Sequence, residues 1–189
     1  MISLIGLYGL SSLMVFPVCL IDRHRYRQIN GRLIGFYSRR LLNLLECTVT
    51  VRPDTDLNNY NGLIVSNHLS YLDILMISSC IPACYVTSQE IKETPFLGAL
   101  TRLAGCLFVE RRSRENLDAE IHELTDALTR GLNVVVFPEG TSTNGSGVLR
   151  FRQPLFQSAI NAGVSILPLT LNYESLDGLP VSIQNRDRL

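Results

Sequence analysis

Residues 63–73 run Leu-Ile-Val-Ser-Asn-His-Leu-Ser-Tyr-Leu-Asp. The apolar run Leu63–Val65 predicts a buried strand, and the apolar run Ile74–Ile77 that follows predicts the beginning of a helix. A histidine and a carboxylate therefore lie where a strand passes into a helix. Open α/β sheets carry their functional groups at this position, beyond the carboxyl ends of the strands.

The spacing between His68 and Asp73 restricts how the two side chains can meet. They are five residues apart, which in one continuous helix would leave them about 140° apart around the axis. If Ser70 is the N-cap, His68 precedes the helix and Asp73 lies in its first turn. His68 can then fold back so that Asp73 accepts a hydrogen bond from one ring nitrogen, which leaves the other as a base. The alternative is a variant capping box formed by Ser70 and Asp73, without catalysis.

The composition fits one α/β domain. A chain of 189 residues is long enough for such a domain with its own core. The formal net charge is zero, so bulk charge does not indicate nucleic acid or another polyanion as a partner. The five cysteines are scattered and complete no zinc-ligand pattern. We expect reduced thiols in a domain that faces the cytosol.

The amino-terminal segment favours contact with a membrane. Residues 1–21 are almost uncharged, and the basic cluster Asp22–Arg27 follows at once. About 20 apolar residues can span a bilayer, and the basic cluster would keep the following chain in the cytoplasm. Glycines and Pro17 interrupt the run, so a helix in the membrane interface or a re-entrant hairpin remains open. A buried core helix is the remaining alternative.

The elements that follow alternate between two patterns. An amphipathic helix is expected within residues 31–47. Strands are predicted at 47–51, 63–65, 84–87, 105–109, 133–137 and 164–171. Helices are predicted at 71–80, from Pro95 to 103, at 117–128 and at 151–162. The alternation predicts an α/β fold with a mixed, largely parallel sheet flanked by helices. Pro168 places the last strand at a sheet edge or a bulge.

This pattern divides the chain into two parts. Residues 1–45 are expected to form membrane-associated helices, and residues 46–189 the α/β domain. The tail from Asn172 is polar, and we expect no closing element in it.

Two further polar clusters follow predicted strands. Arg111 comes after the strand at 105–109, and its planar guanidinium suits a phosphate monoester. Glu139, Gly140 and Thr141 come after the next strand. Gly140 lets a substrate approach the backbone, while Glu139 can accept from a substrate hydroxyl and Thr141 can donate to one. The alternatives are surface arginines that open a helix, and a turn that caps one.

Taken together, these stretches resemble the glycerolipid acyltransferase family, whose members acylate lysophosphatidic acid and related lysolipids. The resemblance covers roughly residues 60–172. It rests on four motifs in order: Asn67-His68-x4-Asp73, Gly105-x-x-Phe108-x-x-Arg111, Phe137-Pro138-Glu139-Gly140-Thr141 and Ile166-Leu167-Pro168-Leu169.

The resemblance implies a function and a site. His68 would be the base and Asp73 would orient it, while acyl-CoA or acyl carrier protein would donate the acyl group. The leading acceptor would be 1-acylglycerol-3-phosphate, giving phosphatidic acid at the cytoplasmic side of a membrane, the inner one in a bacterium. Neither a metal nor a cofactor is expected. Substrate contacts are implied for Arg111, Glu139, Gly140 and Thr141.

The chain also departs from the family pattern. It ends soon after the fourth motif, so the resemblance implies that a carboxyl-terminal portion is missing. Residues 142–147, Ser-Thr-Asn-Gly-Ser-Gly, also resemble members that acylate lyso-ornithine and other non-phosphate lipids, for which the phosphate role of Arg111 would fall away. Two other functions remain open. One is a thioester or ester hydrolase, against which the missing Gly-x-Ser-x-Gly elbow argues, and the other is an inactive membrane-binding member.

Overall fold

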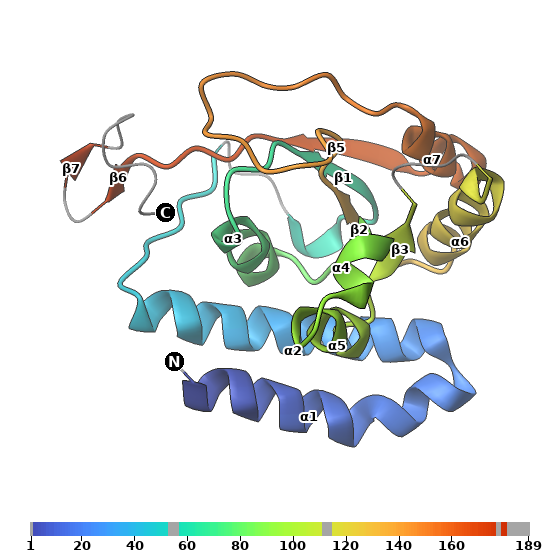
Figure 1. Ribbon diagram of the computed structural model, residues 1–189, viewed down its shortest axis with the longest axis horizontal. Helices are drawn as coiled ribbons and strands as arrows, with labels where there is room; N and C mark the ends of the chain where they lie inside the picture. The colour runs from blue at the N-terminus through green and yellow to red at the C-terminus, as the bar shows by residue number, and fades with distance from the viewer. Residues whose placement is uncertain (1, 53–56, 111–114, 177–178, 181–189) are drawn as a thin grey trace.

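A five-stranded parallel sheet forms the centre of the molecule (Figure 1). The computed structural model describes residues 2–52, 57–110, 115–176 and 179–180. Every pairing within this sheet is parallel, which confirms the predicted α/β class. Across the sheet, the strands are β3 (Leu107–Val109), β2 (Cys84–Ser88), β4 (Val134–Val136), β1 (Gly62–Ser66) and β5 (Ser165–Leu169).

The two central strands are buried on both faces. On one face, Leu63 and Val134 pack beneath α6 (Leu117–Thr129) and α7 (Gln157–Ala162). On the other face, Ile64 packs with residues of α3 (Leu72–Cys80). Helices on both faces explain why these strands are continuous apolar runs rather than alternating ones.

Two long helices form an outer layer on the α3 side. Helix α2 (Arg23–Leu44) packs against α3, and α1 (Ile2–Ile21) runs alongside α2 (Figure 1). The predicted amphipathic helix begins earlier than expected, because the Asp22 side chain accepts hydrogen bonds from the main-chain N–H groups of His24 and Arg25 and so caps α2. In the part of the chain that the structure describes, one helix segment, Leu4–Ile21, is long and apolar enough to cross a membrane.

Several predicted elements differ from the structure. The strand predicted at 47–51 is wrong, since this segment is irregular and pairs with no described strand. The predicted helix at 151–162 is shorter, because it begins only with the 3-10 turn η2 (Pro154–Phe156) and continues as α7. Shorter elements complete the described chain: η1 (Leu57–Asn59), α4 (Gln89–Glu93), α5 (Leu97–Leu103), and the antiparallel pair β6 (Ser175–Leu176) and β7 (Leu179–Pro180). This last pair lies in the tail from Asn172, where the sequence predicted no element.

The edge position predicted for the proline-containing strand is confirmed. Among the described strands, β5 pairs only with β1, and Pro168 lies opposite Val65. A proline lacks the main-chain N–H that a second neighbour would need, so β5 suits the edge of the sheet. The chain beyond β5 then passes along the carboxyl end of β1, toward the segment that holds His68.

Candidate active site

The loop after β1 brings His68 onto Asp73, as the spacing requires. His68 Nδ1 lies 2.7 Å from Asp73 Oδ2. The imidazole also stacks on the ring of Phe137, with the ring centroids 4.2 Å apart. Phe137 follows β4, which is the neighbour of β1 in the sheet. Two adjacent strands therefore deliver the imidazole and the ring that stacks on it.

Asp73 is fully buried, and its carboxylate accepts from every partner that the structure describes for it. Its Oδ2 accepts from His68 and from the main-chain N–H groups of Leu69 (2.6 Å) and Ser70 (3.1 Å). Its Oδ1 accepts from the hydroxyl of Tyr173 at 2.6 Å. Because a carboxylate accepts only, we assign the proton of the imidazole to Nδ1, which leaves the lone pair on Nε2.

The turn before α3 caps the helix and also forms the His68–Asp73 contact, so the two alternatives from the sequence are compatible. Helix α3 begins at Leu72 rather than directly after Ser70. The Ser70 hydroxyl nevertheless accepts from the main-chain N–H of Leu72 at 3.1 Å. The Ser70 carbonyl accepts from the main-chain N–H of Asp73. Asp73 thus satisfies main-chain donors at the start of the helix and binds His68 at the same time.

Glu139 holds the main chain of the site together. Its side chain is 6% exposed, and its two oxygens accept from the main-chain N–H groups of His68 (3.0 Å) and Leu149 (2.8 Å). The main-chain N–H of Thr143 in turn donates to the carbonyl of His68 at 2.9 Å. The described partners of the Glu139 carboxylate are thus main-chain amides, and its contact with a substrate stays a prediction.

The other predicted substrate contacts lie in the same turn or outside the described residues. Gly140 has a φ of 75°, and a methyl group on its Cα would lie 3.1 Å from Nε of Arg152. The described group that approaches this glycine is therefore a guanidinium. Thr141 is exposed beside it, with its hydroxyl 3.4 Å from the carbonyl of Ser142. Arg111 lies outside the described residues.

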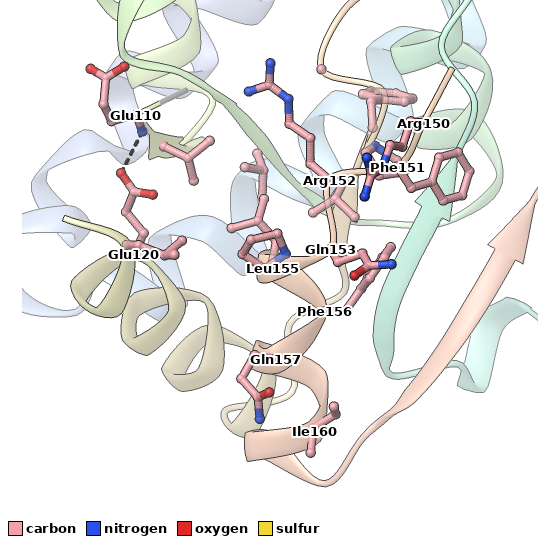
Figure 2. A pocket seen from close by; sticks show the side chains of 18 residues that line it. Glu110, Glu120, Arg150, Phe151, Arg152, Gln153, Leu155, Phe156, Gln157 and Ile160 are labelled. Carbon is pink, nitrogen blue, oxygen red and sulfur yellow. Dashed lines mark hydrogen bonds between the residues drawn. The ribbon is translucent and has the colours of Figure 1, made fainter. Parts of the chain in front are cut away.

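A pocket of about 1090 Å³ opens next to Phe137, beyond the carboxyl ends of β2, β3 and β4. Its lining includes apolar side chains of these strands and of the segment 154–160, such as Val86, Val136 and Leu155. In the view of Figure 2, Glu110 and Glu120 lie on one side, Arg150 and Phe151 on the other, and Arg152 between them. An apolar lining with charged groups suits an amphiphilic ligand.

The pocket carries a partly buried carboxylate. Glu120 accepts from the main-chain N–H of Glu110 at 2.6 Å, and burial raises the pKa of the Glu120 carboxyl. Since raised carboxyl pKa values are also common in purely structural positions, this shift alone assigns no role to Glu120. Its hydrogen bond fixes the chain as it leaves β3, directly before Arg111.

Sequence patterns missed three residues that the structure places at the site. Arg150 and Arg152 flank Phe151 just after the glycine-containing segment 140–147, and the repeated arginine is the one sequence signal that marks them. Tyr173 stands in a polar tail, and nothing in its neighbourhood distinguishes it. Among the described residues, no group of three or more His, Cys, Asp or Glu side chains could hold a metal ion.

Comparisons with known proteins agree with this geometry. The family model described as Acyltransferase matches residues 48–172. A 1-acyl-sn-glycerol-3-phosphate acyltransferase of Neisseria gonorrhoeae is 41% identical over 114 residues, which cover 60% of this chain and 45% of that protein. A lyso-ornithine lipid O-acyltransferase of Pseudomonas aeruginosa is 36% identical over 118 residues, covering 62% of this chain and 45% of that protein.

A solved structure has the same fold. The 1-acyl-sn-glycerophosphate acyltransferase PlsC from Thermotoga maritima superposes with a TM-score of 0.59 and 24% sequence identity, covering 86% of this chain and 71% of that one. The present chain spans about half the length of the curated relatives it matches, 45% for the Neisseria protein.

Proposed function

Because this chain belongs to the acyltransferase family, we propose that it moves a fatty acyl group from a thioester to the free hydroxyl of a lysolipid. One observation carries the proposal: His68 Nδ1 contacts Asp73 Oδ2 at 2.7 Å, which orients the imidazole as a base. Neither residue lines the pocket with its apolar lining and charged groups, and Phe137 is the link between that pocket and the imidazole, since it stacks on the imidazole and lines the pocket. The amphiphilic lining fits a lipid acceptor better than a small polar one.

The reaction needs no covalent intermediate on the protein. Nε2 of His68 takes the proton of the lysolipid hydroxyl, and that oxygen attacks the thioester carbonyl. A C–O bond forms, the tetrahedral intermediate collapses, and the C–S bond breaks. The proton on His68 then passes to the departing thiolate. Asp73 holds the imidazole in the required tautomer throughout.

The leading acceptor in this proposal is 1-acylglycerol-3-phosphate, which would yield phosphatidic acid. Support comes from the names of the Neisseria and Escherichia coli relatives, the latter 32% identical over 145 residues. Arg150 and Arg152 supply cationic groups at the pocket, and Arg111 remains a proposed phosphate contact.

A second acceptor class has its own support. Relatives named as lyso-ornithine lipid O-acyltransferases are 32–36% identical to this chain. The pocket also presents the carboxylates Glu110 and Glu120, which could receive the amino group of a zwitterionic headgroup. We place the phosphate acceptor first because the two Neisseria relatives, at 41% identity, carry that name.

A panel of acceptors and donors tests the proposal. The full chain is incubated with 1-acylglycerol-3-phosphate, a lyso-ornithine lipid or a neutral lysolipid, each with acyl-CoA or acyl carrier protein, and products are read by lipid mass spectrometry. We expect a new diacyl lipid, and a fall in rate of about 10²–10⁴-fold in His68→Ala. His122→Ala, which removes an exposed imidazole on α6, is the matched control and should keep the rate.

Each other outcome contradicts part of the proposal. An unchanged rate in His68→Ala would remove the dyad from the mechanism. Free fatty acid without an acylated lipid would identify a hydrolase. Vesicle binding without turnover of any donor would identify an inactive membrane-binding member.

A further inference from the structure

We propose that Tyr173 is a positioning residue of the site: it holds the Asp73 carboxylate in one orientation, and through it the His68 imidazole. This inference rests on the proposed acyl transfer and deepens it. Tyr173 lies one residue beyond the segment that the family model matches, which ends at 172. Its role therefore follows from this chain's own geometry.

Tyr173 and His68 bind opposite oxygens of the same carboxylate. The phenol donates to Asp73 Oδ1 at 2.6 Å, and the imidazole contacts Asp73 Oδ2 at 2.7 Å. A carboxylate bound at one oxygen can still turn about the bond to its Cβ, because this terminal torsion is broad. Bonds to both oxygens fix the plane of the carboxylate, and so fix where His68 must lie to reach it.

The direction of a second hydrogen bond follows from the first. The Tyr173 hydroxyl has one proton and donates it to Asp73. In the 2.9 Å hydrogen bond between Ser70 Oγ and the Tyr173 hydroxyl, Ser70 must therefore be the donor. Ser70 Oγ also accepts from the main-chain N–H of Leu72. The result is a chain of donors from the start of α3 to Asp73. Successive bonds of this kind polarise and strengthen one another.

The phenol keeps its proton under ordinary conditions. Burial is the main cause that raises the pKa of Tyr173 above its usual value, and the adjacent Asp73 raises it further. A negative phenolate beside a buried carboxylate would be doubly unfavourable. Tyr173 is thus a permanent donor in this site rather than a base that competes with His68.

Tyr173 itself stands outside the four motifs, and Asn67 of the first motif helps to hold its segment in place. Tyr173 and Asp73 are 100 residues apart in the sequence. The side chain of Asn67 accepts from the main-chain N–H of Leu171 at 2.7 Å and donates to its carbonyl at 3.0 Å. The segment after β5 is therefore fastened directly beside His68, two residues before the tyrosine. These two hydrogen bonds to Asn67 hold the phenol near Asp73 before the substrates bind.

Kinetics of Tyr173→Phe test the proposal with the confirmed acceptor and donor. The variant keeps the ring and removes only the donor. We expect kcat to fall about 10-fold, which corresponds to the free energy lost with one hydrogen bond to a charged group. KM should stay unchanged because the phenol does not touch the substrate. Tyr60→Phe is the matched control. It removes a partly buried tyrosine hydroxyl, bonded to the carbonyl of Ser165 at the other end of the sheet, and should keep wild-type kinetics.

A double-mutant cycle separates positioning from general structure. In the Asp73→Ala background the phenol has no carboxylate to hold, so adding Tyr173→Phe should cause no further fall in kcat. Ser70→Ala is a second variant, which keeps Tyr173 and removes the hydroxyl that donates to it. We expect kcat to fall less in Ser70→Ala than in Tyr173→Phe. Thermal unfolding of each variant shows whether the fold is retained.

Three results would overturn the assignment. One is wild-type kcat in a folded Tyr173→Phe, and another is an undiminished effect of Tyr173→Phe in the Asp73→Ala background. The third is a change confined to KM, which would make Tyr173 a substrate contact. Failure of the wild-type chain to acylate any lysolipid would instead overturn the proposed function, so the two failures are distinguishable.

Discussion

A single buried carboxylate, Glu139, connects three segments of the chain. It accepts from the main-chain N–H groups of His68 and Leu149, and it stands in the turn that follows β4. A glutamate at this place can therefore act on catalysis without contacting a substrate. Glu139 fixes the backbone of His68, whereas Asp73 contacts the His68 ring and Tyr173, in our proposal, orients that carboxylate.

Removing this carboxylate should weaken the fold and the site together. Glu139→Ala leaves two main-chain N–H groups without their acceptor, each at a cost of about 1–3 kcal/mol. We expect the free energy of unfolding in urea to fall by at least the cost of one such group, about 1–3 kcal/mol. We expect kcat to fall as well. Glu139→Gln keeps one oxygen acceptor and should lie between. Glu174→Gln, at an exposed position, is the control. Wild-type unfolding of Glu139→Ala would contradict the bridging role.

At the scale of elements, the site depends on adjacency in the sheet. Strands β1 and β4 are neighbours and parallel, so the segments that follow them leave the same edge. The first carries His68 and the second carries Phe137 and Glu139. Strand β5 flanks β1 on its other side and delivers Tyr173. No pair of these residues is close in sequence, apart from Phe137 and Glu139.

The sequence predicted the elements whose causes are local. Strands β1 and β4 are buried on both faces, and their unbroken apolar runs identified them. The contact of His68 with Asp73 also followed from a five-residue spacing across one turn. The bond from Tyr173 to Asp73 and the two acceptor bonds of Glu139 depend on tertiary packing between distant segments, so no local pattern indicated them. Residues 47–51 show the converse, because β-branched alternation favours an extended chain but supplies no partner strand.

Close contact between α2 and α3 leads to a prediction at the element scale. A methyl group on Gly35 would lie 2.7 Å from the carbonyl oxygen of Ser78, so the helices can approach only with glycine there. Gly35→Ala would gain about 1 kcal/mol in helix propensity, but overpacking costs about 1–3 kcal/mol. We expect a net loss of stability in thermal unfolding. Gly9→Ala, with no atom within 4 Å of the added methyl, should show no loss. Equal stability of both variants would contradict the tight contact.

At the scale of the whole molecule, α1 presents an apolar surface to solvent. Leu13, Met14 and Leu20 are 58%, 73% and 80% exposed. The opposite side of α1 packs along α2, where Ser12 donates to Asn30 in a buried contact. An apolar face of this size that no described element covers suits a lipid surface.

The packing of α1 against α2 favours an interfacial helix over a membrane span. The two helices run side by side over their length (Figure 1). If α1 crossed the bilayer in this arrangement, α2 would carry the exposed Arg32 and Arg40 into the hydrocarbon. Each buried arginine is costly there. A helix that lies in the interface keeps these charges in water and places the α/β domain against the lipid surface.

Vesicle experiments distinguish these arrangements. Met14→Glu places a charge on the exposed face of α1, and we expect flotation with anionic phospholipid vesicles to weaken about 10-fold, equivalent to about 1.4 kcal/mol. Ile166→Glu, at an exposed apolar residue of β5, should bind as the wild type does. An amino-terminal tag on vesicle-bound protein should remain open to protease added outside, because an interfacial α1 leaves both of its ends on one side. Protection of the tag while the α/β domain stays accessible would show that α1 spans the bilayer and that its contact with α2 opens on insertion.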